Sequence, residues 1–167
     1  LYVSDSSNSR ISIFDERHGF APLGSLRCAA GGPLTLSAPA GLAFMADGRL
    51  IVATTVTETL LAETLLAGRP WPGDPMTNRK RRVRTVRGYV RIITLSADGL
   101  AALSEQVLFV GGRARLGGVC VSEEPTPRVF VVNTLAHAVF VLEPATLAMA
   151  HLLGGDSARL SECVWFG

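Results

Sequence analysis

The sequence has few of the residues that mark a disulfide-rich or metal-binding protein. Of its 167 residues, three are cysteine: Cys28, Cys120 and Cys163. No two of them stand in a Cys-x-x-Cys spacing, and three cysteines cannot all pair within one chain. Each lies in or beside an apolar stretch, so we expect buried thiols and no disulfide framework.

Long apolar runs and targeting signals are also missing. The most apolar region, residues 129–153, is interrupted by polar residues such as Asn133 and Glu143, so we expect no membrane span. The chain opens without an initiator methionine or a basic segment, so no signal peptide is visible. We therefore interpret the chain as a piece of a longer protein and slightly favour a cytoplasmic location.

What the sequence does contain is enough apolar surface for a folded core. Apolar residues make up 48% and charged residues 18%, with a mean hydropathy of +0.33, which excludes a disordered tail or a coiled coil. Seventeen glycines and nine prolines indicate many turns, which favours short strands over long helices. Length and composition together predict a single domain over residues 1–167.

A strand–turn–strand pattern occurs three times along the chain. Residues 1–14 and 129–142 show it directly, and residues 50–54 find their partner strand later, at residues 89–95. A weaker amphipathic stretch and a short apolar strand follow each copy. The weaker stretches are residues 20–26, 106–110 and 148–153, and the apolar strands are residues 40–44, 117–121 and 162–166. Four-stranded units with a period of roughly 45 residues are typical of β-propeller blades.

Two segments carry a resemblance to a known family. Residues 2–15, with Asp5, Asn8 and Arg10 in order, are similar to the strand–hairpin core of NHL-repeat propellers. Residues 38–53 resemble the entry to a blade in that family, where a Pro-x-Gly strand leads into an Asp-Gly turn. The resemblance implies an all-β fold of propeller blades, each of four antiparallel strands, with three blades in an incomplete ring. Missing sequence or another chain would then close the ring.

The residues of the turns and strands have structural interpretations within that fold. We expect Arg10 to tie its hairpin to Asp5 or to a neighbouring blade, and Asn8 to adopt the left-handed conformation of a tight turn. We expect Gly41, together with Gly117 and Gly118, to allow close backbone approach between strands.

No catalytic site is predicted. Related propeller lyases and lactonase-like enzymes resemble this fold and hold a metal on their innermost strands, where this chain offers only Glu162 at one end. The histidines, His18, His137 and His151, fall in a turn, a hairpin loop and an outer strand. No GxGxxG, P-loop or Gly-x-Ser-x-Gly motif occurs. We expect no catalytic residues, no metal and no cofactor, and keep a fragment of such an enzyme as an alternative.

The second unit carries a long insertion, residues 55–87, that concentrates positive charge. Six of the nine residues from 79 to 87 are cationic, and Trp71 precedes them in a proline-rich loop. The candidate partner-binding residues are Trp71, Arg79, Lys80, Arg81, Arg82, Arg84 and Arg87. Such a run fits an acidic protein surface or the phosphates of RNA.

Two points about the insertion stay open at this stage. Residues 56–67 could instead form a helix, since Leu60, Leu61, Leu65 and Leu66 would line one face. The leading functional hypothesis is a non-enzymatic, protein-binding scaffold module, and the alternative is an RNA-binding propeller that uses the basic insertion. Base stacking has little support, because Trp71 and Tyr89 are the only aromatic residues near the run.

Overall fold

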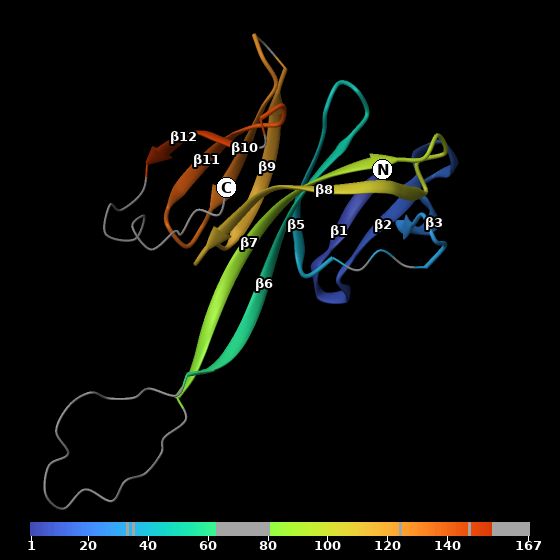
Figure 1. Cartoon of the computed structure of the whole chain (residues 1–167). Helices are drawn as coiled ribbons and strands as arrows, with labels where there is room; N and C mark the ends of the chain where they lie inside the picture. Colours follow the sequence, from blue (N-terminus) through green and yellow to red (C-terminus); the bar gives the residue numbers. More distant parts are fainter. Residues whose placement is uncertain (33, 35, 63–80, 124, 147, 155–167) are drawn as a thin grey trace, which may run out of the picture.

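A computed structural model describes residues 1–32, 34, 36–62, 81–123, 125–146 and 148–154. These residues form twelve β-strands and two short 3-10 helices, η1 (Ser6–Asn8) and η2 (Glu16–His18), and no α-helix. The strands make three sheets in chain order (Figure 1). The predicted all-β class is therefore confirmed. None of the helices in this part of the chain has the length and apolar character to cross a membrane.

The N-terminal sheet is a three-stranded antiparallel meander. Its strands are β1 (Tyr2–Asp5), β2 (Arg10–Asp15) and β3 (Ala21–Ser25), in that spatial order. Residue Tyr2 lies opposite Ile13 and Asp5 lies opposite Arg10. Polar and apolar residues alternate in the central strand β2, whose Ile11 and Ile13 are buried, as expected for a sheet with one buried face.

The middle sheet has five strands, and its central pair is unusually long. Its strands are β5 (Pro39–Phe44), β6 (Leu50–Ala62), β7 (Arg81–Leu95), β8 (Ala101–Gly112) and β4 (Arg27–Cys28), which runs parallel to β8 at the edge. Thr54 lies opposite Tyr89, so the predicted distant pairing is confirmed. The helix alternative for residues 56–67 is wrong as far as Ala62, because cross-strand pairing with β7 outweighs the leucine stripe.

The C-terminal sheet is a four-stranded antiparallel meander. Its strands are β9 (Leu116–Ser122), β10 (Arg128–Asn133), β11 (Ala138–Glu143) and β12 (Ala148–Gly154). The predicted strands at residues 117–121 and 148–153 are confirmed. The strand predicted at residues 162–166 lies outside the described residues.

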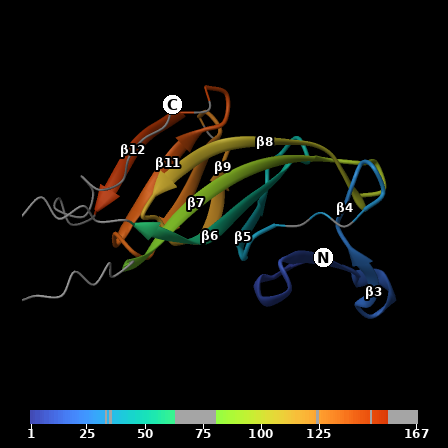
Figure 2. The same ribbon diagram turned by 60° about the horizontal axis from the view of Figure 1, so that its bottom comes forward.

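The three sheets are layered, with the middle one between the other two (Figure 2). Alternate residues of β6 serve two separate cores. Leu50 and Val52 pack with the N-terminal sheet, and Ile51 and Ala53 pack with the C-terminal sheet. All four are fully buried, and each large aliphatic side chain contributes on the order of 1.5–3 kcal/mol to stability. Burial of both faces explains why β6 begins as a continuous apolar run.

Two hairpins of the outer sheets have the same turn. The β1–β2 and β10–β11 loops each hold four residues and end in a residue with positive φ, Ser9 (54°) and His137 (51°). The left-handed residue is therefore Ser9 and not Asn8, whose side-chain amide instead donates to both Asp5 oxygens at 2.9 Å. The expected tie is confirmed, since Arg10 Nε lies 2.8 Å from Asp5 Oδ2.

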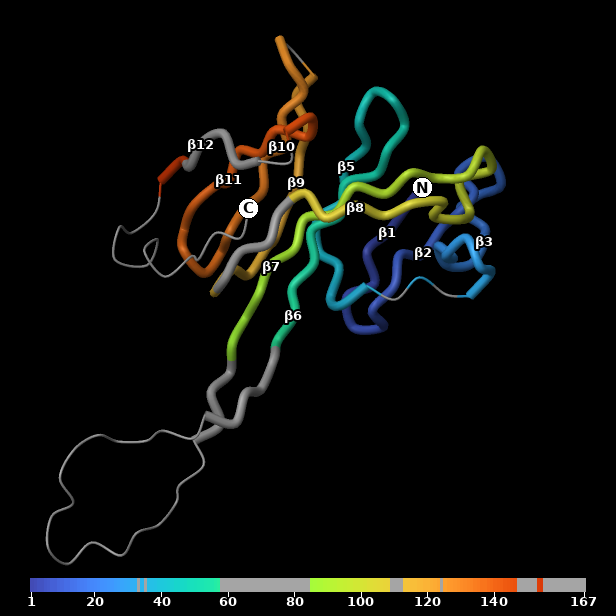
Figure 3. The backbone as a smooth tube through the Cα atoms, in the orientation of Figure 1, coloured from blue at the N-terminus to red at the C-terminus, as the bar shows by residue number. Residues whose placement is uncertain are grey.

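Close approach of two strands from different sheets depends on one glycine. β5 and β9 lie side by side (Figure 3), and a Cβ on Gly41 would stand 2.4 Å from the carbonyl oxygen of Gly117. The expectation for Gly41 is confirmed. It is wrong for Gly117 and Gly118, where an added Cβ would meet ordinary contacts or open space, because their Cβ positions face away from β5.

The cysteine prediction is only partly correct. Cys28 is half-buried, whereas Cys120 is exposed, and Cys163 lies outside the described residues. Cys120 alternates with Val119 and Val121, which pack against the core between the middle and C-terminal sheets. The thiol of Cys120 therefore points to the opposite face of β9, which no other described sheet covers.

Candidate interaction surface

The long hairpin of the middle sheet projects from the body of the protein (Figure 1). β6 and β7 pair without a bulge from Leu50 opposite Ile93 to Ala62 opposite Arg81. β8 pairs with β7 only as far as Arg87, which lies opposite Gly112. Beyond that point the described strands form a two-stranded ribbon, which we call the arm (residues 57–62 and 81–86).

The predicted binding residues divide into three groups in the structure. Arg81, Arg82 and Arg84 lie within β7, on the arm. Arg87 stands at the base of the arm and is half-buried. Arg79, Lys80 and Trp71 lie outside the described residues, so the structure does not locate them.

Two further arginines lie at the base of the arm and were not among the candidates. Arg113 directly follows Gly112, the cross-strand partner of Arg87, and Arg115 lies two residues further on; both are exposed. The sequence signal was the short Gly-Arg-Ala-Arg segment between two strands, and only the pairing of β7 with β8 brings it beside the arm. We call Arg87, Arg113 and Arg115, with the arm, the basic surface.

Specific contacts fix the segment that carries Arg113 and Arg115. The Arg115 backbone N–H donates to Asn133 Oδ1 at 3.2 Å, and its carbonyl accepts from the backbone N–H and Oγ1 of Thr134. The next N–H, of Leu116, donates to Thr55 Oγ1 of β6 at 3.1 Å. The loop that bears the two arginines is thus tied both to β6 and to the β10–β11 turn.

A glycine in β7 allows this loop to pack against the arm. An added Cβ on Gly88 would stand 2.5 Å from Cγ of Leu116. The absence of a side chain at position 88 lets the leucine lie directly on β7. Leu116 is buried in the core shared with the C-terminal sheet, so the base of the arm is anchored to that core.

An aromatic and an arginine lie next to the basic surface on β7. The Arg91 guanidinium lies 5.5 Å from the centre of the Tyr89 ring and also forms an ion pair with Glu105 of β8. Burial lowers the pKa of Arg91, although Tyr89 acts in the opposite direction. Arg91 covers the Tyr89 ring and pairs with Glu105, so both groups are already engaged within the sheet, while the Arg91 Nε is buried without a hydrogen-bond partner among the described residues.

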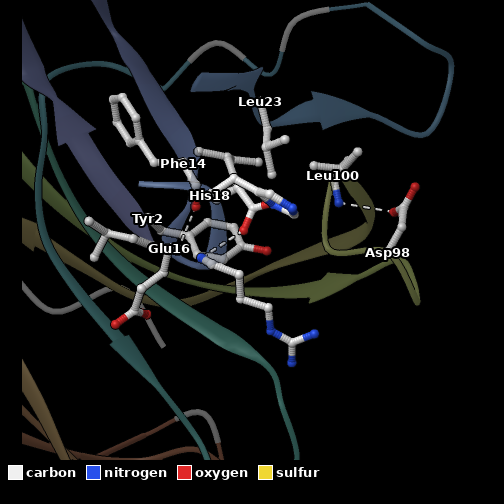
Figure 4. Close-up of a pocket in the computed structure, with 11 residues that line it drawn as sticks. Tyr2, Phe14, Glu16, His18, Leu23, Asp98 and Leu100 are labelled. Carbon is white, nitrogen blue, oxygen red and sulfur yellow. Dashed lines mark hydrogen bonds and ion pairs between the residues drawn. The ribbon is translucent and has the colours of Figure 1, made fainter. Parts of the chain in front are cut away.

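A separate hollow of about 710 Å³ lies between η2, the start of β1 and the β7–β8 turn (Figure 4). His18 Nδ1 lies 2.6 Å from Asp15 Oδ2, and the bond to His18 lowers the pKa of Asp15. The Tyr2 hydroxyl donates to the Gly99 carbonyl at 2.6 Å, and burial raises its pKa.

The groups in the hollow that could serve as nucleophiles beside the His18–Asp15 pair are carboxylates and the Tyr2 hydroxyl, which already donates to Gly99. The lining of the hollow contains no serine, threonine, cysteine or lysine, and its remaining polar residues are Glu16, Arg17 and Asp98. Across the described ranges of the chain, no three His, Cys, Asp or Glu side chains are grouped to hold a metal ion.

Comparison of the chain with protein-family models, with curated proteins and with solved structures finds no match.

Proposed function

We propose that this chain is part of an NHL-like β-propeller that serves as a non-enzymatic interaction module, and that its basic surface binds an acidic protein surface. The observation that carries the proposal is the arm, a paired ribbon that holds arginines at one end of a layered scaffold.

Three features support the propeller interpretation. The sheets follow one another in chain order, the strands from β5 to β8 and those of both outer sheets form antiparallel meanders, and the middle sheet is buried on both faces. The edge strand β5 of the middle sheet lies beside β9, the first strand of the C-terminal sheet. The hairpins β1–β2 and β10–β11 have the same loop length and the same left-handed final residue. Repeated units in these positions are expected for blades around a common axis.

The described aromatic residue near the basic surface favours protein over RNA as the partner. Binding of single-stranded nucleic acid combines cations with aromatic rings on which bases stack. Tyr89 is half-buried, and its ring is already covered by Arg91. An acidic protein surface requires only the arginines, whose planar guanidinium groups bind carboxylates through paired hydrogen bonds.

The test compares two defined anionic probes, poly-glutamate and single-stranded RNA, in a binding titration at several salt concentrations. In one variant Arg113 and Arg115 are replaced by glutamine, and in a second the four cations at positions 79–82 are replaced by glutamine. The matched control replaces Arg17 and Arg27, two exposed arginines away from the arm, by glutamine. We expect each basic-surface variant to bind poly-glutamate at least about tenfold more weakly, and the control to bind within about twofold of the parent.

The outcomes separate the two partner classes. If the parent binds RNA but not poly-glutamate, and the basic-surface variants lose this RNA binding, the partner is RNA and not an acidic protein. Equal affinity of parent and both basic-surface variants for poly-glutamate would refute the proposal. Elemental analysis that finds a stoichiometric metal would contradict its non-enzymatic part.

A further inference from the structure

Within the part of the chain that the structure describes, each outer sheet has one apolar face that belongs to neither core. On the C-terminal sheet this face carries Phe130, Val132, Val139 and Leu153, since cross-strand partners share a face. Val132 is 40% exposed and Leu153 is 52% exposed, while Val141 at the centre of the face is buried. Exposed aliphatic residues gathered on one sheet face indicate an interaction surface.

The pairing register of the strands shows which residues of the N-terminal sheet are equivalent to these positions, and therefore what covers them there. In the β1–β2 hairpin Tyr2 pairs with Ile13 and Asp5 with Arg10, and in the β10–β11 hairpin Phe130 pairs with Val141 and Asn133 with Ala138. The two hairpins therefore have the same register and loop length, so their residues can be matched one by one. The equivalents of Phe130, Val139 and Val141 are Tyr2, Ile11 and Ile13.

Those equivalents are covered by the middle sheet. Ile11 is 1% exposed and Ile13 is 3% exposed, and Tyr2 packs against the same core. The free face of the C-terminal sheet thus uses the positions that, in the first of the three repeats, bury against the next sheet along the chain.

The reverse holds for the free face of the N-terminal sheet: its residues have equivalents that are buried in the C-terminal sheet. Leu1, Val3 and Phe14 lie on this face, and Leu1 and Val3 are 54% and 41% exposed. Their equivalents in the C-terminal sheet are Val129, Val131 and Leu142. All three equivalents are fully buried in the core against the middle sheet.

We infer that these two free faces pack on each other between two copies of this chain. Within one copy they cannot meet, because the middle sheet separates the two outer sheets. The contact is heterologous, since a patch with Val132 binds a different patch with Val3. Two such contacts close a symmetric dimer, in which three sheets from each copy follow one another. The inference does not involve the basic surface.

The experiment measures the mass of the full chain by sedimentation equilibrium. We expect about twice the 17.7 kDa of one chain. Val132→Lys and Val3→Lys each place a charge in both contacts and should raise the dissociation constant at least about 100-fold, which leaves a monomer. Leu103→Lys is the matched control, because Leu103 on β8 is 57% exposed and lies on neither free face.

A mixture of the two lysine variants tests the pairing itself. In a V3K–V132K heterodimer one contact combines both substitutions and the other keeps Val132 against Val3, so the mixture should associate more strongly than either variant alone. Circular dichroism checks that both variants keep the β-sheet spectrum of the parent. If a lysine variant does not, the corresponding threonine variant, Val132→Thr or Val3→Thr, replaces it. Each threonine variant should also raise the dissociation constant, by a smaller factor. A monomeric parent, or a dimer unaffected by the substitutions, would overturn the inference.

Discussion

Substitution of Gly41 by alanine tests the packing of the middle sheet against the C-terminal sheet. The new methyl group would lie 2.4 Å from the Gly117 carbonyl oxygen and 2.7 Å from the backbone nitrogen of Val119. The first distance is about 1 Å short of the 3.4 Å at which ordinary contact begins. Both atoms belong to the backbone of β9, so no side-chain rotation can relieve the clash. We expect a loss of about 3 kcal/mol, at the upper end of the usual cost of overpacking.

Urea denaturation followed by circular dichroism measures this loss. A cost of about 3 kcal/mol lowers the midpoint by roughly 1.5 M for a slope of about 2 kcal/mol/M. Gly118→Ala is the matched control on β9, because its added methyl group meets open space. Alanine there should be neutral or stabilise by up to about 1 kcal/mol, since it restricts the unfolded chain. If G41A unfolds within about 0.5 kcal/mol of the parent, the two strands do not approach as closely as described.

Three further predictions concern polar contacts. Hydrogen bonds from Asn8 and then Arg10 lower the pKa of Asp5 below 3.8, so its stabilising contribution is present above pH 3.8 and lost as the pH falls through the lowered value. Urea midpoints of parent and Asp5→Asn from pH 6 to 2.5 should therefore converge at the acid end, and a constant difference would contradict the assignment. Tyr2→Phe removes the phenol bond to the β7–β8 turn and should cost about 0.5–1.5 kcal/mol in the same assay. Asn133→Ala leaves three backbone N–H groups without their acceptor and should cost about 3 kcal/mol or more; a change below 1 kcal/mol would show that water replaces the amide.

Much of the strand pattern could be predicted from the sequence because local signals agree with tertiary packing. β2 alternates polar and apolar residues, whereas β10 and β11 are nearly continuous apolar runs, and both patterns predict strands with buried side chains. The turn between paired strands is also local, and the Asp5–Arg10 contact follows from it. The partner strand of β6 could be found despite the insertion because both strands are rich in β-branched residues.

The incorrect expectations concern features that depend on neighbours distant in the sequence. The leucines of residues 56–62 suit a helix by spacing alone, and pairing with β7 decides for a strand. The exposure of Cys120 depends on which face of β9 meets the middle sheet. The role of Arg113 and Arg115 at the base of the arm depends on the register of β8 against β7. Side-chain spacing within a segment contains none of this information.

The continuity of β6 and β7 from the cores into the arm has a mechanical consequence. A partner that pulls on the tip draws both strands in the same direction, so the bonds between them bear little of the load. The load passes to the ladders that join β6 to β5 and β7 to β8, where the strands must slide past each other. Sliding would break many backbone hydrogen bonds at once and draw residues such as Ile51 and Val52 out of two cores, so the whole scaffold would resist a pull on the arm.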